Sequence, residues 1–147
     1  MKALITGASS GIGRDIAINL SKKGYDLILV ARDLEKLNEV KSKLHTNVEV
    51  VSMDVSNAEN CKELHEKYPN IDILVNNAGF GDCGYFTKTS LDKELKMIDT
   101  NIVAYHVLTK LYLQDMKQKN SGKILNVASI AGFMPGPLMA TYYSTKA

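Results

Sequence analysis

The sequence lacks the cysteine patterns, long apolar runs and strong net charge that mark several classes of protein. Its two cysteines, Cys61 and Cys83, show neither metal-ligand spacing nor a disulfide framework. No apolar run approaches the roughly 20 residues that a membrane span requires, and the apolar run at the N-terminus is too short for a signal peptide. A net charge of +2 is too small to indicate nucleic acid or a membrane as a partner. We therefore expect a cytoplasmic protein with reduced thiols.

No metal site is expected either, because His45, His65 and His106 lie on separate expected helices without ligand spacing. Hydrophobic residues make up 45% of the sequence and charged residues 23%, close to the averages of globular proteins. A chain of 147 residues can bury roughly 68–70% of the surface that its unfolded form exposes. This composition excludes a disordered chain, collagen and a small disulfide scaffold.

Short β-branched runs alternate with longer amphipathic stretches along the chain. The runs predict strands, and their nearly continuous apolar character is typical of burial on both faces. The expected strands are 2–6, 26–31, 48–52, 71–76 and 123–128, and the expected helices are 12–23, 33–45, 57–68 and 91–119. Residues 77–89 and 132–138 are expected to be loops. The alternation predicts an α/β fold, with residues 1–147 forming a single domain around a doubly wound, Rossmann-type parallel sheet.

Residues at the ends of these helices predict their caps. Gly24 follows the first helix, Asp33 precedes the second, and Ser56 or Asn57 begins the third. The long helix is predicted to bury one apolar side, which comprises Leu95, Ile98, Ile102, Tyr105, Leu108 and Tyr112.

The first strand and helix are joined by the turn Thr6-Gly7-Ala8-Ser9-Ser10-Gly11-Ile12-Gly13. Unpaired amides at a helix N-terminus bind phosphate, and glycines let a pyrophosphate approach the backbone. A strand before the turn and a helix after it favour a dinucleotide site over an ordinary flexible turn. No Gly-Lys-Ser/Thr ends the turn, which excludes a P-loop, and its spacing differs from the common Gly-x-Gly-x-x-Gly fingerprint.

The spacing Thr-Gly-x-x-x-Gly-x-Gly resembles that of the short-chain dehydrogenase/reductase family. Further segments of the chain resemble the family's motifs in order: Asp54-Val55, Asn76-Asn77-Ala78-Gly79, Asn101, and Ser129 followed by Tyr142-x-x-x-Lys146. The resemblance implies an oxidoreductase that transfers a hydride between a nicotinamide cofactor and a small-molecule carbonyl or alcohol. It also implies a homodimer or homotetramer.

The end of the second strand indicates which cofactor to expect. Folds that prefer NAD usually place an acidic residue there, whereas this strand ends in Ala31-Arg32. A guanidinium can hold a 2′-phosphate with paired hydrogen bonds, so Arg32 favours NADP(H), and NAD(H) remains an alternative. By resemblance, Ser10 and Arg14 lie near the same corner. Asp33 counts against this interpretation, and Arg32 could instead be a solvated residue at the start of a helix.

The resemblance also implies a set of cofactor-binding residues. Asp54 would lie near the adenine amino group, Val55 would line the ring pocket, and Asn76, Ala78 and Gly79 would support the sheet and pass the adenosine ribose. Ordinary loop and turn roles are the alternative for each. The full expected set is Gly7, Ser9, Ser10, Gly11, Ile12, Gly13, Arg32, Asp54, Val55, Asn76, Ala78, Gly79, Tyr142 and Lys146.

Proton transfer to a carbonyl oxygen needs an acid, and a nearby ammonium lowers the pKa of a phenol toward a useful range. Tyr142 and Lys146 are four residues apart and share a helix face; Tyr143 could share it too, and the family's pattern selects Tyr142. The same pattern assigns Ser129 to the substrate oxygen. Taken singly, each residue could be a turn, packing or tail residue.

Asn101 lies between Ile98 and Ile102, where an unpaired amide would cost roughly 1–3 kcal/mol. The resemblance implies a water-mediated relay to Lys146, and a backbone contact that kinks the helix is a compatible explanation. Tyr85, Phe86 and Phe133 could line the substrate side or pack locally.

Members of the resembled family continue beyond the lysine with further strands and a substrate loop. We therefore expect these 147 residues to be the cofactor-binding half of a larger chain, with C-terminal strands and helices missing. A non-catalytic dinucleotide-binding module, acting as a sensor or interaction protein, is the alternative from another class. A subunit completed by another chain is a third possibility.

Overall fold

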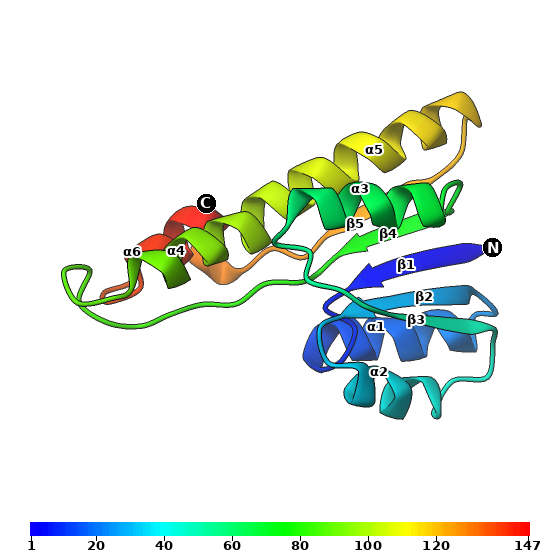
Figure 1. The fold of residues 1–147 in the computed structure, drawn as a ribbon, viewed down its shortest axis with the longest axis horizontal. Helices are drawn as coiled ribbons and strands as arrows, with labels where there is room; N and C mark the ends of the chain where they lie inside the picture. Colours follow the sequence, from blue (N-terminus) through cyan, green and yellow to red (C-terminus); the bar gives the residue numbers. More distant parts are fainter.

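The computed structural model describes residues 1–147, and its centre is a five-stranded parallel sheet with the strand order β3-β2-β1-β4-β5 (Figure 1). The strands are β1 (Lys2–Thr6), β2 (Asp26–Ala31), β3 (Val48–Ser52), β4 (Ile73–Asn76) and β5 (Lys123–Asn126). All neighbouring strands pair in parallel. The predicted α/β class and doubly wound sheet are confirmed.

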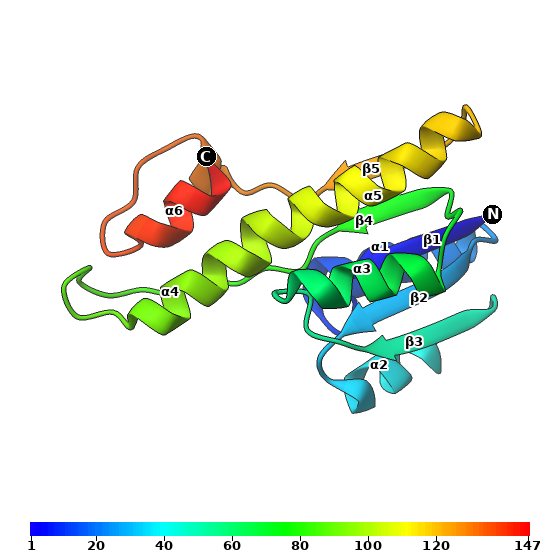
Figure 2. The same cartoon turned by 45° about the horizontal axis from the view of Figure 1, so that its top comes forward.

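The helices cover the sheet on both faces, as Figures 1 and 2 show. They are α1 (Gly11–Lys22), α2 (Leu34–Lys41), α3 (Ala58–Lys67), α4 (Leu91–Ile98), α5 (Ala104–Gln118) and α6 (Ala140–Lys146), with a π-helical segment η1 (Asp99–Val103) and a 3₁₀ turn η2 (Ile130–Gly132). The helices α1 and α2 lie on one face, and α3 and α5 lie on the other. None of them has the length and apolar character that a membrane span demands.

Side chains of the central strand divide the core into two clusters because they alternate between the faces of the sheet. Leu4 packs in the cluster that includes Leu64 of α3 and Leu108 of α5. Ala3 and Ile5 pack in the other cluster, against the buried residues of α1 and α2. The sheet is therefore buried on both faces, as its continuous apolar strands predict.

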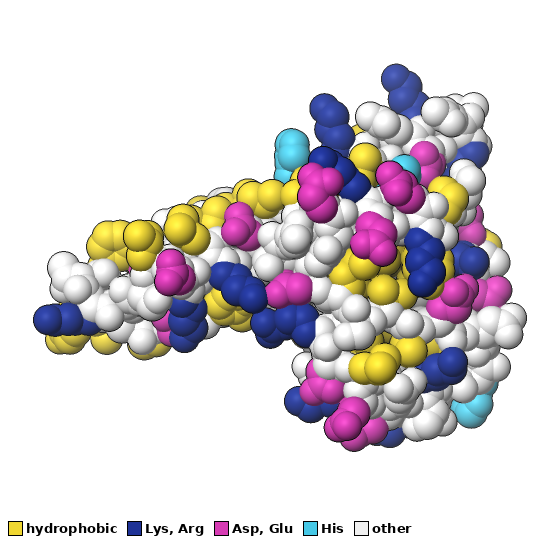
Figure 3. All heavy atoms as spheres, viewed as in Figure 1, with side chains coloured by type: hydrophobic (Ala, Val, Ile, Leu, Met, Phe, Trp, Pro, Cys, Tyr) yellow, Lys and Arg dark blue, Asp and Glu magenta, His cyan; other side chains and the backbone are white.

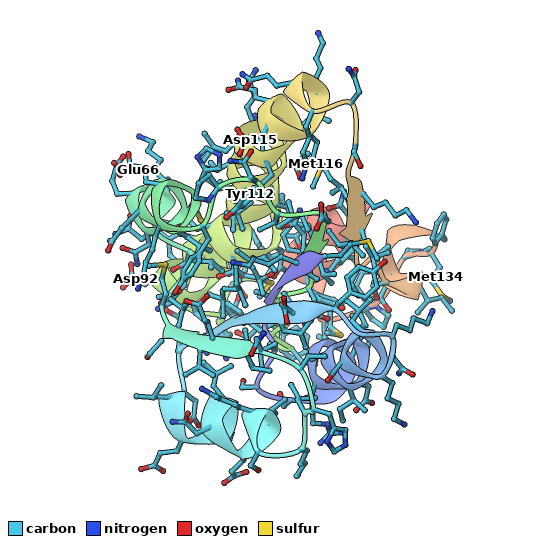
Figure 4. The ribbon with its side chains drawn as sticks, turned by 90° about the vertical axis from the view of Figure 1, so that its right-hand side faces the viewer. Glu66, Asp92, Tyr112, Asp115, Met116 and Met134 are labelled. Carbon is cyan, nitrogen blue, oxygen red and sulfur yellow. The ribbon has the colours of Figure 1, made fainter.

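The packing of α5 against α3 includes polar groups as well as apolar ones. Tyr112 and Asp115 lie on the side of α5 that faces α3 (Figure 4). His65 of α3 lies 2.8 Å from Asp115 through its Nε2, and its ring stacks edge-on against Tyr112 at 4.9 Å between centroids. These two contacts of His65 hold α5 against α3. The segments η1 and α4, which precede α5, carry part of the candidate site.

The ends of several elements differ from their predicted positions. Asp33 caps α2 by accepting a hydrogen bond from the Lys36 amide, but the helix ends at Lys41 and not at residue 45, because the next residues form tighter three-residue turns. Asn57, rather than Ser56, caps α3. The strands β4 and β5 are shorter than predicted, at Ile73–Asn76 and Lys123–Asn126. Gly24 follows α1 with a φ of +81°, the conformation expected of a glycine after a helix.

The predicted apolar side of the long helix is wrong in its N-terminal half. Leu95 and Ile102 are 50% and 44% exposed, whereas Glu94, Thr100 and Asn101 are buried. The reason is that α4 and η1 extend beyond the sheet and pack against α6 and the loop before α4 (Figure 2). Leu108 and Tyr112, where the helix does cover the sheet, are buried as predicted.

Candidate active site

A cleft of about 960 Å³ opens at the carboxyl ends of the strands, where α/β sheets of this kind bind ligands. Twelve of the residues predicted from the sequence line it: Gly7, Ser9, Ser10, Gly11, Ile12, Arg32, Asp54, Val55, Ala78, Gly79, Tyr142 and Lys146. Gly13, Asn76, Asn101 and Ser129 do not line it. The cleft therefore runs from the glycine turn to α6.

The glycine turn forms a cradle with little side-chain bulk. Gly7 and Gly11 have φ angles of +64° and +53°, which favour glycine. A side chain on Gly13 would overlap the carbonyl oxygen of Gly7, so this glycine permits close packing of α1 on the turn. No side chain caps α1, and the amides of its first turn remain available. This cradle fits a pyrophosphate group.

Thr6 and Asn77 hold the turn in place. The Thr6 hydroxyl accepts hydrogen bonds from the amides of Asn77 and Ala78 at 3.0 and 3.1 Å. The Asn77 side chain donates to the carbonyl oxygens of Thr6 and Gly7 at 3.0 and 3.1 Å. No role for Asn77 was predicted from the sequence, although it lies within the Asn-Asn-Ala-Gly segment.

Asn76 lies beneath the cleft and not in its wall. Its side chain is fully buried and donates to Thr109 Oγ1 at 3.0 Å and to Asn126 Oδ1 at 2.9 Å. These bonds tie β4 to β5 and α5.

Charged side chains gather where β2 ends. Arg32, Asp33 and Lys36 line the cleft, and Arg32 forms no ion pair. Asp33 accepts from the Lys36 amide at 3.0 Å and lies 3.3 Å from the Lys36 ammonium. The Lys36 amide is the main reason that the pKa of Asp33 lies below its usual value. Arg14 pairs instead with Asp15 and lies outside the cleft wall. Lys36 was not predicted from the sequence to lie in the site.

Asp54 has fixed partners on both carboxylate oxygens. Oδ1 accepts from the amide and hydroxyl of Ser56 at 3.1 and 2.8 Å. Oδ2 pairs with the Lys96 ammonium of α4 at 2.9 Å. Burial acts to raise the pKa of Asp54, but hydrogen bonds from Lys96 and Ser56 outweigh it and hold the pKa below its usual value. Asp54 is therefore an ionised acceptor at the cleft wall.

Tyr142 and Ser129 meet at the other end of the cleft. The Tyr142 hydroxyl donates to Ser129 Oγ at 3.3 Å, and Ser129 Oγ also accepts from the Ala131 amide at 3.1 Å. Lys146 lies one helical turn after Tyr142 and donates to the Val127 carbonyl at 3.3 Å. Tyr143 packs over Gly136, where a side chain would overlap its ring. Of the two adjacent tyrosines, only Tyr142 lines the cleft.

Asn101 is buried and fully partnered. Its Oδ1 accepts from the Phe80 amide at 3.1 Å, and its Nδ2 donates to the Phe80 carbonyl at 3.0 Å and to Thr145 Oγ1 at 2.9 Å. It lies in the π-helical segment η1, so the expected backbone contact and helix irregularity occur together. A Cβ on Gly79 would lie 3.0 Å from Asn101 Oδ1 and 3.6 Å from Lys146 Nζ. Asn101 thus lies just behind the cleft wall.

Tyr105 is an aromatic neighbour of Lys146 that was not predicted from the sequence to lie in the site. The Lys146 ammonium lies 5.5 Å from the centre of its ring. Burial, with a smaller effect of Tyr142, raises the pKa of Tyr105 to about 12. Tyr105 therefore remains protonated near neutral pH.

A parallel sheet in this order, with a glycine turn after β1 and a Tyr-x-x-x-Lys helix beside the cleft, is typical of dinucleotide-binding α/β proteins. The family model described as short chain dehydrogenase matches residues 1–147. The chain belongs to this family, as the resemblance of its motifs predicts.

Relatives and solved structures agree with this assignment. The chain is 37% identical over 149 residues to an uncharacterized oxidoreductase of Bacillus subtilis, covering 98% of this chain and 56% of the relative. It is 37% identical over 145 residues to the 3-oxoacyl-[acyl-carrier-protein] reductase of Rickettsia prowazekii, covering 99% of this chain and 60% of the relative. The chain thus spans little more than half the length of these relatives.

Two solved structures share the fold closely. The closed form of serine dehydrogenase complexed with NADP⁺ superposes with a TM-score of 0.92 at 35% identity, covering 99% of this chain and 61% of that one. A short-chain dehydrogenase from Sphingobium yanoikuyae in complex with NADPH superposes with a TM-score of 0.91 at 32% identity, covering 99% and 59%.

Proposed function

We propose that this protein is an NADP(H)-dependent oxidoreductase that acts on a small-molecule carbonyl or alcohol. The observation that carries the proposal is the 3.3 Å hydrogen bond between Tyr142 and Ser129, beside a cleft whose other end is the glycine turn. Lys146 lines the same cleft one helical turn away. The names of the relatives as oxidoreductases and reductases support the reaction class.

The residues of the cleft fit the parts of a dinucleotide in order. The glycine turn from Gly7 to Gly13 would hold the pyrophosphate, while Asp54 and Val55 would hold the adenine. Arg32, with Ser10 and Lys36 nearby, would hold the 2′-phosphate. Ala78 and Gly79 would pass the adenosine ribose, with Asn76 supporting them from below. Two related structures are named as complexes with NADP⁺ and NADPH, which supports the same cofactor here, with NAD(H) as the alternative.

The bound nicotinamide supplies a hydride in reduction and accepts one in oxidation. In reduction, Tyr142 donates its proton to the substrate oxygen, and it takes the proton back in oxidation. The Ser129 hydroxyl donates a hydrogen bond to the same oxygen and stabilises its developing charge. Lys146 would hold the nicotinamide ribose, and its positive charge would stabilise the anion left on the Tyr142 oxygen. Asn101, whose side chain is bonded to Phe80 and Thr145, would position the water-mediated relay to Lys146.

The substitution Tyr142→Phe tests this assignment. It removes the proton donor but keeps the ring, so turnover of NADPH with a carbonyl panel should fall by about 100-fold or more. The dissociation constant of NADPH should stay within a few-fold of its original value. The matched control is Tyr143→Phe, which removes the hydroxyl from a ring packed over Gly136 and should leave turnover unchanged.

Unchanged turnover in Tyr142→Phe would contradict the assignment of the acid. An unmodified protein that binds NADPH but reduces no carbonyl would favour the non-catalytic module. An intact-mass measurement on the native protein shows whether these residues are part of a longer chain.

We also propose that the protein forms a homodimer or homotetramer. The exposed side of α4 and η1 supports this, because Leu91, Leu95 and Ile102 are 67%, 50% and 44% exposed at helical spacing. Figure 3 shows hydrophobic side chains gathered along the extension that α4 forms. A second copy of the chain would cover this face.

A further inference from the structure

Lys96 connects two parts of the molecule that come from distant segments. It lies on α4, which extends beyond the sheet, and its ammonium contacts Oδ2 of Asp54 at 2.9 Å, just after β3. Lys96 does not line the cleft, whereas Asp54 does. Any effect of Lys96 on a bound ligand therefore passes through Asp54.

The contacts of Asp54 fix its carboxylate in position. The Ser56 amide and hydroxyl occupy one oxygen, and Lys96 occupies the other. The Asn60 side chain donates to the Asp54 backbone carbonyl at 2.8 Å and holds the main chain as well. Without Lys96, Oδ2 would have no fixed donor, and only the Ser56 contacts to Oδ1 would orient the carboxylate.

An ionised carboxylate accepts hydrogen bonds and cannot donate them. It attracts the amino group of a 6-aminopurine and repels the carbonyl oxygen of a 6-oxopurine. This selectivity needs a carboxylate that is charged and correctly turned. An aspartate is ionised near neutral pH in any case, and Lys96 contributes to the orientation by holding the second oxygen. The pair is worth little to folding, since the Lys96 and Asp54 side chains are 46% and 33% exposed.

We propose that Lys96 is a specificity-determining residue for the cofactor base, which holds Asp54 so that the cleft selects adenine over a 6-oxopurine. The inference rests on the proposed function, in which Asp54 lies beside the adenine. It assigns a role in cofactor selection to a residue outside the cleft wall.

The test compares dissociation constants for NADPH and for its analogue with hypoxanthine in place of adenine. The unmodified protein should prefer NADPH by about tenfold or more, the value of a hydrogen bond to a charged group. In Lys96→Met this preference should fall to about twofold. Lys96→Arg restores a donor to Oδ2 and should recover most of the preference. The measurement is of binding and needs no turnover.

Lys93→Met is the matched control. Lys93 lies on the same helix and pairs with Asp82 at 2.6 Å, and neither residue lines the cleft. The control therefore removes the same charge and one ion pair, and its preference for NADPH should equal that of the unmodified protein. Asp54→Asn, which removes the charged acceptor directly, should lose the preference even with Lys96 present.

The outcomes separate this inference from the proposed function. A Lys96→Met variant that keeps the full preference while Asp54→Asn loses it would overturn the role of Lys96 alone. A protein that binds both compounds equally would overturn the position of adenine beside Asp54, and the inference with it. A protein that binds neither would overturn the proposed function itself.

Discussion

Arg32 and Asp33 are neighbours of opposite charge, and their side chains have different surroundings. The Asp33 carboxylate is occupied by the amide and ammonium of Lys36, while Arg32 has no ion-pair partner. An acidic residue at this corner would normally weaken a site for a 2′-phosphate. Here the Lys36 ammonium compensates the charge of Asp33, so Asp33 counts less against a 2′-phosphate at Arg32 than the sequence alone indicates.

Arg32→Asp should reverse the preference between NADPH and NADH, because a carboxylate repels the 2′-phosphate and accepts a hydrogen bond from a 2′-hydroxyl. The measurement is the ratio of dissociation constants for the two cofactors. Lys41→Asp makes the same change of charge at the far end of α2, outside the cleft, and should leave the ratio unaltered. An Arg32→Asp variant that still favours NADPH would show that another residue binds the 2′-phosphate.

The site residues that were predicted from the sequence lie mostly after the carboxyl ends of the strands. At those places residue type and position along the chain are enough to predict a site residue. The residues that it missed act through contacts that no spacing reveals. Lys36 neutralises a neighbour, Asn77 holds the glycine turn, and Lys96 reaches Asp54 from a segment far along the chain. Such roles depend on tertiary contacts and become visible only in the folded molecule.

At the scale of elements, the strands were predicted well and the helix faces less so. The strands β1, β2 and β3 have the predicted bounds because their apolar runs are short and end at turn residues. The buried side of α4 and η1 carries Glu94, Thr100 and Asn101, whose partners are polar groups and not the apolar sheet. Hydrophobic periodicity cannot identify a face that is buried against polar groups.

The contact between α1 and the glycine turn yields a prediction of stability. Gly13→Ala would place a methyl group on the Gly7 carbonyl oxygen and the Asn77 side chain, although alanine normally favours a helix. We expect a loss of about 1–3 kcal/mol in the free energy of unfolding, measured with urea. Asn19→Ala, at an exposed position of the same helix, should cost less than about 0.5 kcal/mol. Equal stability of the two variants would contradict the close packing at Gly13.

At the scale of the whole molecule, the sheet with its covering helices forms one part and α4 with α6 extends from it (Figure 1). The extension carries Tyr142 and Lys146 toward the cleft on its inner side. Its outer side carries the exposed apolar residues of α4 and η1. The extension formed by α4, η1 and α6 thus contributes to the candidate site on one side and to the proposed contact between subunits on the other.

Replacing Leu95 and Ile102 together by Lys should convert the proposed oligomer into a monomer, because burying two unpaired charges is costly. Light scattering after gel filtration measures the mass. Gln114→Lys, at an exposed polar position of α5, should keep the original mass. An unmodified protein that is monomeric at micromolar concentration would contradict the proposal of an oligomer.

The strand order β3-β2-β1-β4-β5 allows the sheet to form in the order in which the chain is synthesised. As the ribosome releases it from the N-terminus, β2 joins one edge of β1 and β3 joins β2, and then β4 joins the free edge of β1 and β5 joins β4. No strand has to insert between two that are already paired. The sheet can therefore grow outward during translation, with the glycine turn and its Asn77 contacts completed before α6 emerges.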